Sequence, residues 1–199
     1  MRKIVVGMFV SLDGVMEGPG PGDDFPLAGW TMPYWDEDVA QYVDASMAAS
    51  DTLLLGRITY QAFAVAFGDA PAHNPDAATM NSFTKYVVST TLEQADWANS
   101  TLIRQNVVEE IARLKDQPGR DIAISGSGQV VHTLMRANLI DEYRLLIYPV
   151  ILGQGKRLFP PDVPVTLELV DARTSAKGVL LVTYRPAQGP AATPGAHGG

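Results

Sequence analysis

Short apolar runs with strand character alternate with helical patterns over the first three quarters of the 199-residue sequence. Strands that alternate with helices build a mainly parallel sheet that is covered by helices on both faces. The last two apolar runs, 165–170 and 178–184, have no helix between them, so we expect them to pair antiparallel. The predicted fold class is therefore α/β, with a mainly parallel central sheet and antiparallel C-terminal strands. The other expected strands are 3–10, 51–56, 85–89, 101–104, 122–124 and 142–152, the last one interrupted by Pro149.

Helices are expected between these strands. One begins near Asp36, one follows Arg57, a short one covers 76–83, and one follows Asn106. Asn106 and Glu109 have the spacing of a capping box, which predicts that the Asn106 side chain caps that helix. In the last helix one apolar face is formed by Val130, Val131, Leu134 and Met135.

Length and composition indicate one domain, predicted over residues 1–185, because a chain with 46% hydrophobic residues can bury a substantial core. The segment 186–199 is rich in Pro, Ala and Gly and is predicted to be a disordered tail.

The charge of the chain excludes several classes of partner. A net charge of −7 would repel nucleic acid and an anionic membrane surface.

The sequence also lacks the features of several other classes of protein. No apolar run is long enough to span a bilayer. The absence of cysteine excludes disulfides and fits a cytoplasmic location. The three histidines are isolated in the sequence, so no metal centre is expected.

A phosphate cradle is one interpretation of the segment Ser125-Gly126-Ser127-Gly128, which leads from a strand directly into a helix. Glycines allow a phosphate to approach the backbone, and the N–H groups at the positive end of a helix attract it. The alternative is that these glycines only permit a tight turn. The short motif does not decide between the two.

Polar residues or glycines also follow three other expected strands, as Asp13-Gly14, Gly56-Arg57 and Ser89-Thr90. Because ligands of parallel sheets bind outside the carboxyl ends of the strands, we expect these clusters and Ser125-Gly126 to line one crevice.

In this order and spacing, the motifs resemble the dihydrofolate-reductase-like superfamily, and within it the reductase domain of bacterial riboflavin-biosynthesis deaminase-reductases and its stand-alone relatives. The similarity covers residues 3 to 185 approximately. The matching segments are Ser11–Gly14, Leu55–Tyr60, Lys85–Ser89, Ile124–Gly128, Leu139–Glu142, Pro149–Gly155 and Leu158–Phe159.

The resemblance implies a three-layer dihydrofolate-reductase-like fold, NADPH as the hydride donor, and a homodimer, because relatives pair. It implies that Arg57 contacts the 2′-phosphate of the cofactor, with Thr59, Ser89 and Thr90 as hydroxyl partners. A guanidinium group fits a phosphate bidentately, and an arginine at a helix start is unfavourable without an anion nearby. The alternative is an ordinary surface arginine. The remaining cofactor contacts are assigned to Gly56, Ser125, Gly126, Ser127 and Gly128, the last three at the pyrophosphate.

Reduction of a heterocycle needs a proton and a group that orients the ring. A partly buried acid with a raised pKa serves both needs. The riboflavin-type branch implies Asp13 in this role, whereas folate-reducing members place the acid on the first helix, where Asp36, Glu37 or Asp38 would serve. The competing explanations are turn chemistry for Asp13 and helix capping for the other three. Gly153, Gly155, Trp35 and Phe159 are the other predicted substrate contacts, the two aromatic rings by stacking or else as anchors of the fold.

The sequence departs from the riboflavin-pathway pattern after Asp13-Gly14, where a basic residue is usual and Val15-Met16-Glu17 follows instead. Lys156 and Arg157 would be the remaining phosphate contacts. We therefore expect a small unphosphorylated substrate such as a pterin, a dihydrofolate or an aminopyrimidine. The leading hypothesis is an NADPH-dependent reductase. The alternative is a nucleotide-binding or regulatory module that has lost turnover.

Overall fold

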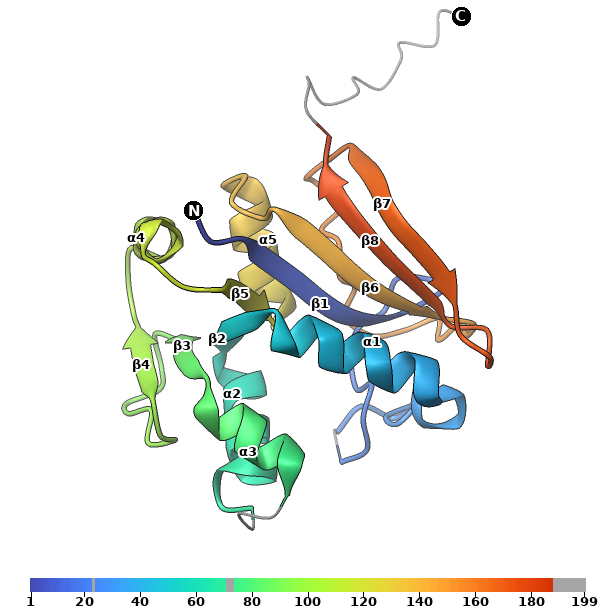
Figure 1. Cartoon of the computed structure of the whole chain (residues 1–199), viewed down its shortest axis with the longest axis horizontal. Coiled ribbons are helices and arrows are strands. Elements are labelled where there is room, and N and C mark those ends of the chain that lie inside the picture. Colours follow the sequence, from blue (N-terminus) through green and yellow to red (C-terminus); the bar gives the residue numbers. More distant parts are fainter. Residues whose placement is uncertain (23, 71–73, 188–199) are drawn as a thin grey trace, which may run out of the picture.

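The computed structural model describes residues 1–22, 24–70 and 74–187. Eight strands of these residues form one sheet in the order β4-β3-β2-β5-β1-β6-β8-β7 (Figure 1). The strands are β1 (Ile4–Ser11), β2 (Ser50–Gly56), β3 (Thr84–Val88), β4 (Ser100–Ile103), β5 (Asp121–Ile124), β6 (Glu142–Tyr148), β7 (Leu167–Thr174) and β8 (Leu180–Pro186). Strands β1 to β6 pair in parallel, and β8 pairs antiparallel with both β6 and β7. The predicted fold class is confirmed.

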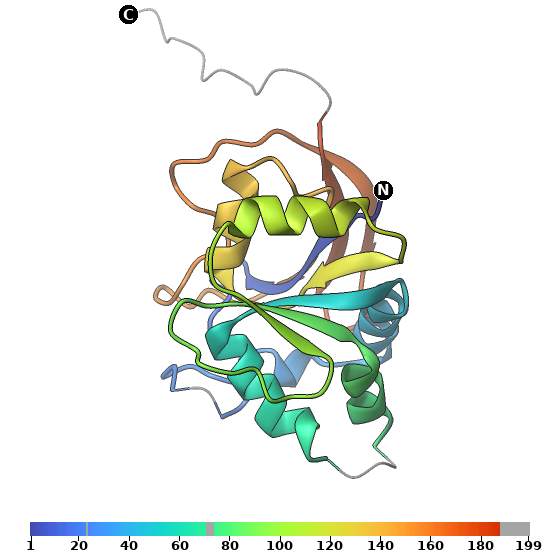
Figure 2. The same cartoon turned by 90° about the vertical axis from the view of Figure 1, so that its left-hand side faces the viewer.

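Helices cover both faces of the sheet (Figure 2). They are α1 (Glu37–Ala48), α2 (Arg57–Phe63), α3 (Pro75–Ser82), α4 (Val107–Asp116) and α5 (Gly128–Arg136), with a 3-10 turn (Met32–Tyr34) and a π turn (Ala64–Gly68). Helices α4 and α5 pack on one face, and α1, α2 and α3 on the other. The predicted apolar face of α5 is confirmed, since Val130, Val131, Leu134 and Met135 are all buried.

Two local predictions are wrong. Asn106 does precede α4, but its backbone is left-handed (φ 51°) and its side chain makes no capping hydrogen bond, so there is no capping box. The strand expected to continue past Pro149 ends at Tyr148, because proline has no N–H group to donate to a sheet. Strand β8 reaches Pro186, one residue beyond the predicted domain end. Of the predicted tail, residues 188–199 lie outside the described residues.

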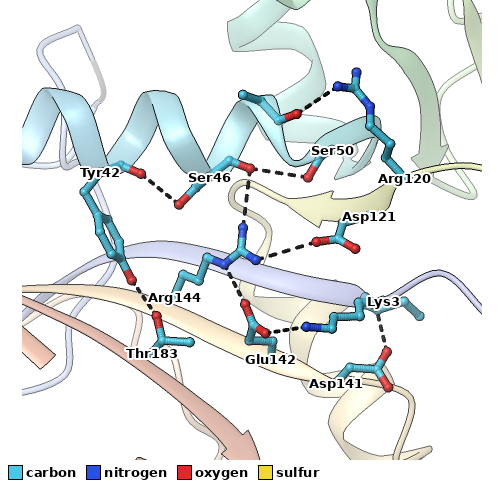
Figure 3. A network of polar contacts seen from close by, with 12 residues as sticks. Lys3, Tyr42, Ser46, Ser50, Arg120, Asp121, Asp141, Glu142, Arg144 and Thr183 are labelled. Carbon is cyan, nitrogen blue, oxygen red and sulfur yellow. Dashed lines mark hydrogen bonds and ion pairs between the residues drawn. The ribbon is translucent and has the colours of Figure 1, made fainter. Parts of the chain in front are cut away.

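A polar network around Arg144 closes the amino end of β6 (Figure 3). Arg144 Nε donates to Glu142 Oε1 at 2.6 Å, and Lys3 Nζ donates to Glu142 Oε2 at 3.0 Å. The Arg144 guanidinium also lies 3.6 Å from the Asp121 carboxylate on β5. These charge pairs link β6 to β5 and to Lys3, the residue before β1, at the strand ends opposite to the predicted crevice. Within the described part of the chain, no helix is both long and apolar enough to cross a membrane.

Candidate functional site

The predicted turn clusters lie together, at the carboxyl ends of the parallel strands. Strands β3, β2, β5, β1 and β6 are consecutive neighbours and run in parallel, so their carboxyl ends lie side by side. The turns that leave them contain Ser89-Thr90, Gly56-Arg57, Ser125-Gly126, Asp13-Gly14 and Gly153 in that order. Residues that are far apart in the sequence thus face one rim.

The turns after β2 and β5 touch each other through Ser127. Its hydroxyl oxygen accepts a hydrogen bond from the Gly56 backbone nitrogen at 2.7 Å and lies 3.2 Å from Thr59 Oγ1. A Cβ atom on Gly56 would collide with the Ser127 hydroxyl, and one on Gly126 would lie 2.8 Å from the Thr59 side chain. Both glycines are therefore required by the close approach of the two turns, whether or not a ligand is bound.

The start of α5 has no side-chain cap among the described residues. Ser127 has a left-handed backbone (φ 74°), and its side chain is turned toward Gly56 and does not cap the helix. The N–H groups of Gly128 and Gln129 donate no hydrogen bond to that side chain, whereas those of Val130 and Val131 donate to the Ser127 carbonyl oxygen at 3.0 and 3.2 Å. Helix N–H groups in this situation bind phosphate oxygens readily.

Arg57 begins α2 and is exposed, with its guanidinium group 3.2 Å from the Gln61 side-chain oxygen. No acidic residue lies in the first turn of α2. A cation at the positive end of a helix is unfavourable, and a bound anion would relieve this repulsion. The residues present therefore fit a cofactor that carries several phosphates.

The two predicted hydroxyl partners after β3 differ. Ser89 is buried, and its hydroxyl oxygen accepts hydrogen bonds from the backbone nitrogens of Thr91 and Leu92 at 3.2 and 2.9 Å. It holds the turn in place. Thr90 is exposed at the same rim and is the hydroxyl available to a ligand.

The carboxylate of Asp13 is held by three donors. Ser11 Oγ lies 2.7 Å from Oδ1, and the backbone nitrogens of Leu152 and Gly153 donate at 3.1 and 2.8 Å. The hydrogen bond from Ser11, followed by that from Leu152, lowers the pKa of Asp13 to about 2. The expectation of a raised pKa is wrong, because hydrogen bonds to the charged form outweigh the desolvation. Asp13 is an anion and a hydrogen-bond acceptor in this structure.

The segments 11–17 and 150–158 pair along their length. Val15 and Arg157 form an antiparallel bridge, and the Met16 backbone nitrogen donates to the Lys156 carbonyl oxygen at 2.8 Å. Gly155 has a left-handed φ of 111°, and a Cβ there would meet Val15 and Phe25. The predicted substrate residues Gly153 and Gly155 thus shape this segment, which also reaches the start of α5.

Both basic residues of this pair of segments are already engaged. Lys156 Nζ forms an ion pair with the Glu17 carboxylate, and the Lys156 backbone nitrogen donates to the same carboxylate at 3.0 Å. The hydrogen bond from Lys156 lowers the pKa of Glu17. Arg157 donates to the Asp13 carbonyl oxygen, and its guanidinium lies 4.0 Å from the Asp13 carboxylate.

The acids at the start of α1 have structural partners. Asp36 caps the helix by accepting from the Val39 backbone nitrogen at 3.0 Å, which lowers its pKa, and it also accepts from the Lys177 nitrogen at 3.0 Å. Asp38 accepts from the Ala176 nitrogen at 2.9 Å, and Glu37 accepts from the Gln41 side chain. Capping and attachment of the β7–β8 turn account for all three.

The two predicted aromatic contacts are separated. Trp35 is 40% exposed, and its ring meets Phe9 of β1 edge-on at 6.1 Å. Phe159 packs 6.0 Å from Tyr143, which is near the amino end of β6, so the structure does not bring it together with Asp13. A residue that sequence reasoning missed is Tyr148, buried among aromatic rings at the carboxyl end of β6. No sequence signal distinguishes it from other apolar strand residues.

A groove of about 480 Å³ lies elsewhere, between α1 and the strands β7 and β8. Its lining includes Tyr42, Arg144 and Thr183, which belong to the network of Figure 3. Arg144 lies near the amino end of β6 and is paired with acids, so this groove is separate from the rim described above.

The chain is similar to known proteins over nearly its whole length. The model of the RibD C-terminal domain family matches residues 2–181. The uncharacterized protein YyaP of Bacillus subtilis (strain 168) is 32% identical over 192 residues, which are 92% of this chain and 94% of that protein.

Two solved structures are similar in fold. A pyrimidine reductase-like protein from Corynebacterium diphtheriae has a TM-score of 0.67 at 12% identity, with 94% of this chain and 93% of that chain covered. Dihydrofolate reductase from Enterococcus faecalis, complexed with NADP(H), has a TM-score of 0.60 at 19% identity, with 94% and 97% covered. The predicted dihydrofolate-reductase-like fold is confirmed.

Proposed function

The chain belongs to the RibD C-terminal domain family, and on this premise we propose that it is an NADPH-dependent reductase of a small heterocyclic substrate of the pterin, dihydrofolate or aminopyrimidine type. The observation that carries the proposal is the meeting of the turns after β2 and β5 at Ser127, beside the uncapped start of α5. Bound NADPH would supply the hydride, and the residues of this chain would bind and orient both reactants.

The cofactor would lie along the rim. The backbone of Gly126, Ser127 and Gly128 and the first N–H groups of α5 would face the pyrophosphate. Arg57 would reach the 2′-phosphate, because it is exposed and at the positive end of α2. The remaining proposed contacts are Gly56, Thr59, Ser89, Thr90 and Ser125, with the Ser89 side chain acting through the turn that it holds.

The substrate would lie beside the segments 11–17 and 150–158. A carboxylate whose pKa is about 2 cannot deliver a proton at neutral pH, so the proposed role of Asp13 is to accept hydrogen bonds from N–H groups of the heterocycle. Gly153 and Gly155 would bound the same space, and Trp35 would cover one face of the ring. The proton would come from water or from another group.

The charges near Asp13 favour an unphosphorylated substrate. Two acids, Asp13 and Glu17, face two bases, Lys156 and Arg157, and the four are paired with one another. A phosphate group placed here would compete with Glu17 for Lys156. The proposal therefore excludes a ribose-phosphate tail.

The decisive experiment follows NADPH oxidation with dihydrofolate, dihydropterin and a ribitylaminouracil as substrates. We expect oxidation with at least one of them. NADPH binding without turnover on every substrate would favour the alternative, a non-catalytic nucleotide-binding or regulatory module. Absence of NADPH binding would contradict both.

We further propose that the chain forms a homodimer. Strand β7 is the last strand of the sheet, and its residues Leu169 and Val170 are each 53% exposed, so a strand edge with two exposed apolar side chains is available to a second copy. Light scattering on the purified protein tests this proposal, and a monomer at micromolar concentration would contradict it. A cytoplasmic location stays a prediction.

A further inference from the structure

Tyr148 carries a buried hydroxyl group without a hydrogen-bond partner among the described residues. Only one other buried side-chain polar atom of these residues, Ser100 Oγ, shares this condition. The Tyr148 side chain is fully buried. An unpaired buried hydroxyl destabilises the folded state, and phenylalanine would fill the same space without this penalty. A tyrosine at this position therefore needs an explanation outside the folding of the chain.

The position of Tyr148 is next to the proposed substrate site. It is the last residue of β6 and pairs in register with Ser11, the last residue of β1. Ser11 in turn lies 2.7 Å from the Asp13 carboxylate through its hydroxyl. The tyrosine therefore stands beside the turn that presents Asp13.

Aromatic rings surround Tyr148. Phe9, Trp30 and Tyr34 meet its ring edge-on, with centroids 5.9, 5.3 and 6.1 Å away. Phe9 also contacts Trp35, which is partly exposed. The surroundings are therefore aromatic, and the Tyr148 hydroxyl is a polar atom within them that is unpaired in the described part of the chain.

The Tyr148 hydroxyl is suited to donate a hydrogen bond. Burial raises the pKa of this phenol well above its usual range, and the negative charge of Asp36 raises it further. The group therefore keeps its proton at every physiological pH.

Trp30 and Tyr34 belong to the segment that connects β1 to α1. Several hydrogen bonds join residues within this segment. Trp30 Nε1 donates to the Glu17 carbonyl oxygen at 2.8 Å, and Thr31 Oγ1 donates to that of Pro19 at 2.7 Å. Because the Tyr148 hydroxyl is fully buried in the ligand-free protein, contact with a substrate requires the rings of Trp30 and Tyr34 to move.

We propose that Tyr148 Oη donates a hydrogen bond to a carbonyl oxygen or ring nitrogen of the substrate and so fixes the orientation of the heterocycle next to Asp13. This inference rests on the proposed reductase function. It assigns to Tyr148 a direct contact with the substrate, whereas Asp13 would accept from the N–H groups of the same ring.

The test compares Tyr148→Phe with Ser100→Ala, which removes the other unpaired hydroxyl, on β4. Thermal unfolding is measured without ligand. The NADPH dissociation constant is measured by fluorescence, and the kinetics are measured with whichever of dihydrofolate, dihydropterin and the ribitylaminouracil the wild type reduces fastest. For Tyr148→Phe we expect a Tm equal to or above that of the wild type, an unchanged NADPH dissociation constant, and a KM about tenfold higher, the loss typical of one hydrogen bond. Ser100→Ala is expected to keep the wild-type KM.

A lower Tm for Tyr148→Phe would show that the hydroxyl has a partner in the ligand-free protein and would overturn the inference. An unchanged KM, or an equal rise in Ser100→Ala, would also overturn it while leaving the reductase function intact. If the wild type oxidises NADPH with none of the three substrates, the proposed function fails, and this inference fails with it.

Discussion

The side-chain oxygen of Ser127 lies 2.7 Å from the backbone nitrogen of Gly56, although 71 positions separate the two residues in the sequence. This contact joins the turn after β2 to the turn after β5. It positions the starts of α2 and α5 relative to each other. In the proposed function a dinucleotide would span both helix starts, so Ser127 would act on cofactor binding through its contact with the other turn.

Replacement of Gly56 by alanine tests this contact. The added Cβ would collide with the Ser127 hydroxyl, so we expect Gly56→Ala to lower the free energy of unfolding by about 1–3 kcal/mol and to weaken NADPH binding. Removal of the colliding atoms in the double variant Gly56→Ala/Ser127→Gly should restore most of the stability. Urea unfolding measures both. A double variant as unstable as the single one would contradict the contact.

The acid stability of the chain should depend on Asp13. Its pKa in the folded chain, about 2, is below its ordinary value of 3.8, so the carboxylate stabilises the fold at pH values above 3.8 and this contribution is lost as the pH falls toward 2. We expect Asp13→Asn to be less stable than the wild type at neutral pH, with the difference shrinking between pH 4 and 2, approximately. Asp44→Asn on the exposed side of α1 is the control. Parallel stability curves for wild type and Asp13→Asn would contradict the prediction.

Arg57 should distinguish the two nicotinamide cofactors. If its guanidinium group contacts the 2′-phosphate, Arg57→Ala should weaken NADPH binding by about 10- to 100-fold and leave NADH binding nearly unchanged. Titration of intrinsic fluorescence with each cofactor measures this. Arg185→Ala, in an exposed ion pair with Glu168 on the last strands, controls for the loss of a positive charge. An equal loss of affinity for NADPH and NADH would contradict the contact between Arg57 and the 2′-phosphate.

Much of the fold follows from local patterns in the sequence. Strands β1, β2, β3 and β5 are apolar runs, and the face of α5 repeats with the period of a helix, so burial and local preference agree. The two errors have different causes. Asn106 has the residue type of a helix cap but a left-handed backbone, and its side chain makes no capping hydrogen bond. The strand expected past Pro149 ends at Tyr148, because proline has no N–H group to donate to the sheet.

The meeting of the turns at one edge was also predictable, because all parallel strands point the same way. The roles of single side chains were not. The low pKa of Asp13 depends on backbone nitrogens of Leu152 and Gly153, 139 and 140 positions away. Lys85 is fully buried, donates to the carbonyl oxygens of Phe83 and Ala98, and lies 4.3 Å from the Trp97 ring, and nothing in its own strand indicates this. Long-range pairings of this kind are set by the tertiary structure.

Glu17 should decide whether a phosphorylated substrate is accepted. Its carboxylate holds Lys156 Nζ, so Glu17→Gln should release a cation beside Asp13 and remove a negative charge from the same place. The pair is largely exposed on the lysine side, so the gain is limited. We expect the variant to lower the KM for 5-amino-6-(5-phosphoribosylamino)uracil, relative to the dephosphorylated compound, by up to about fivefold.

The control for this change is Glu168→Gln, which breaks the exposed ion pair with Arg185 far from the rim. It changes the net charge of the chain equally, so any general electrostatic effect appears in both variants. A change of the KM ratio in Glu17→Gln alone would mean that the Glu17–Lys156 pair selects the substrate. An identical KM ratio in wild type and both variants would mean that the phosphate of the substrate does not approach Lys156. The shape of the segments 11–17 and 150–158 would then have to exclude a phosphate tail.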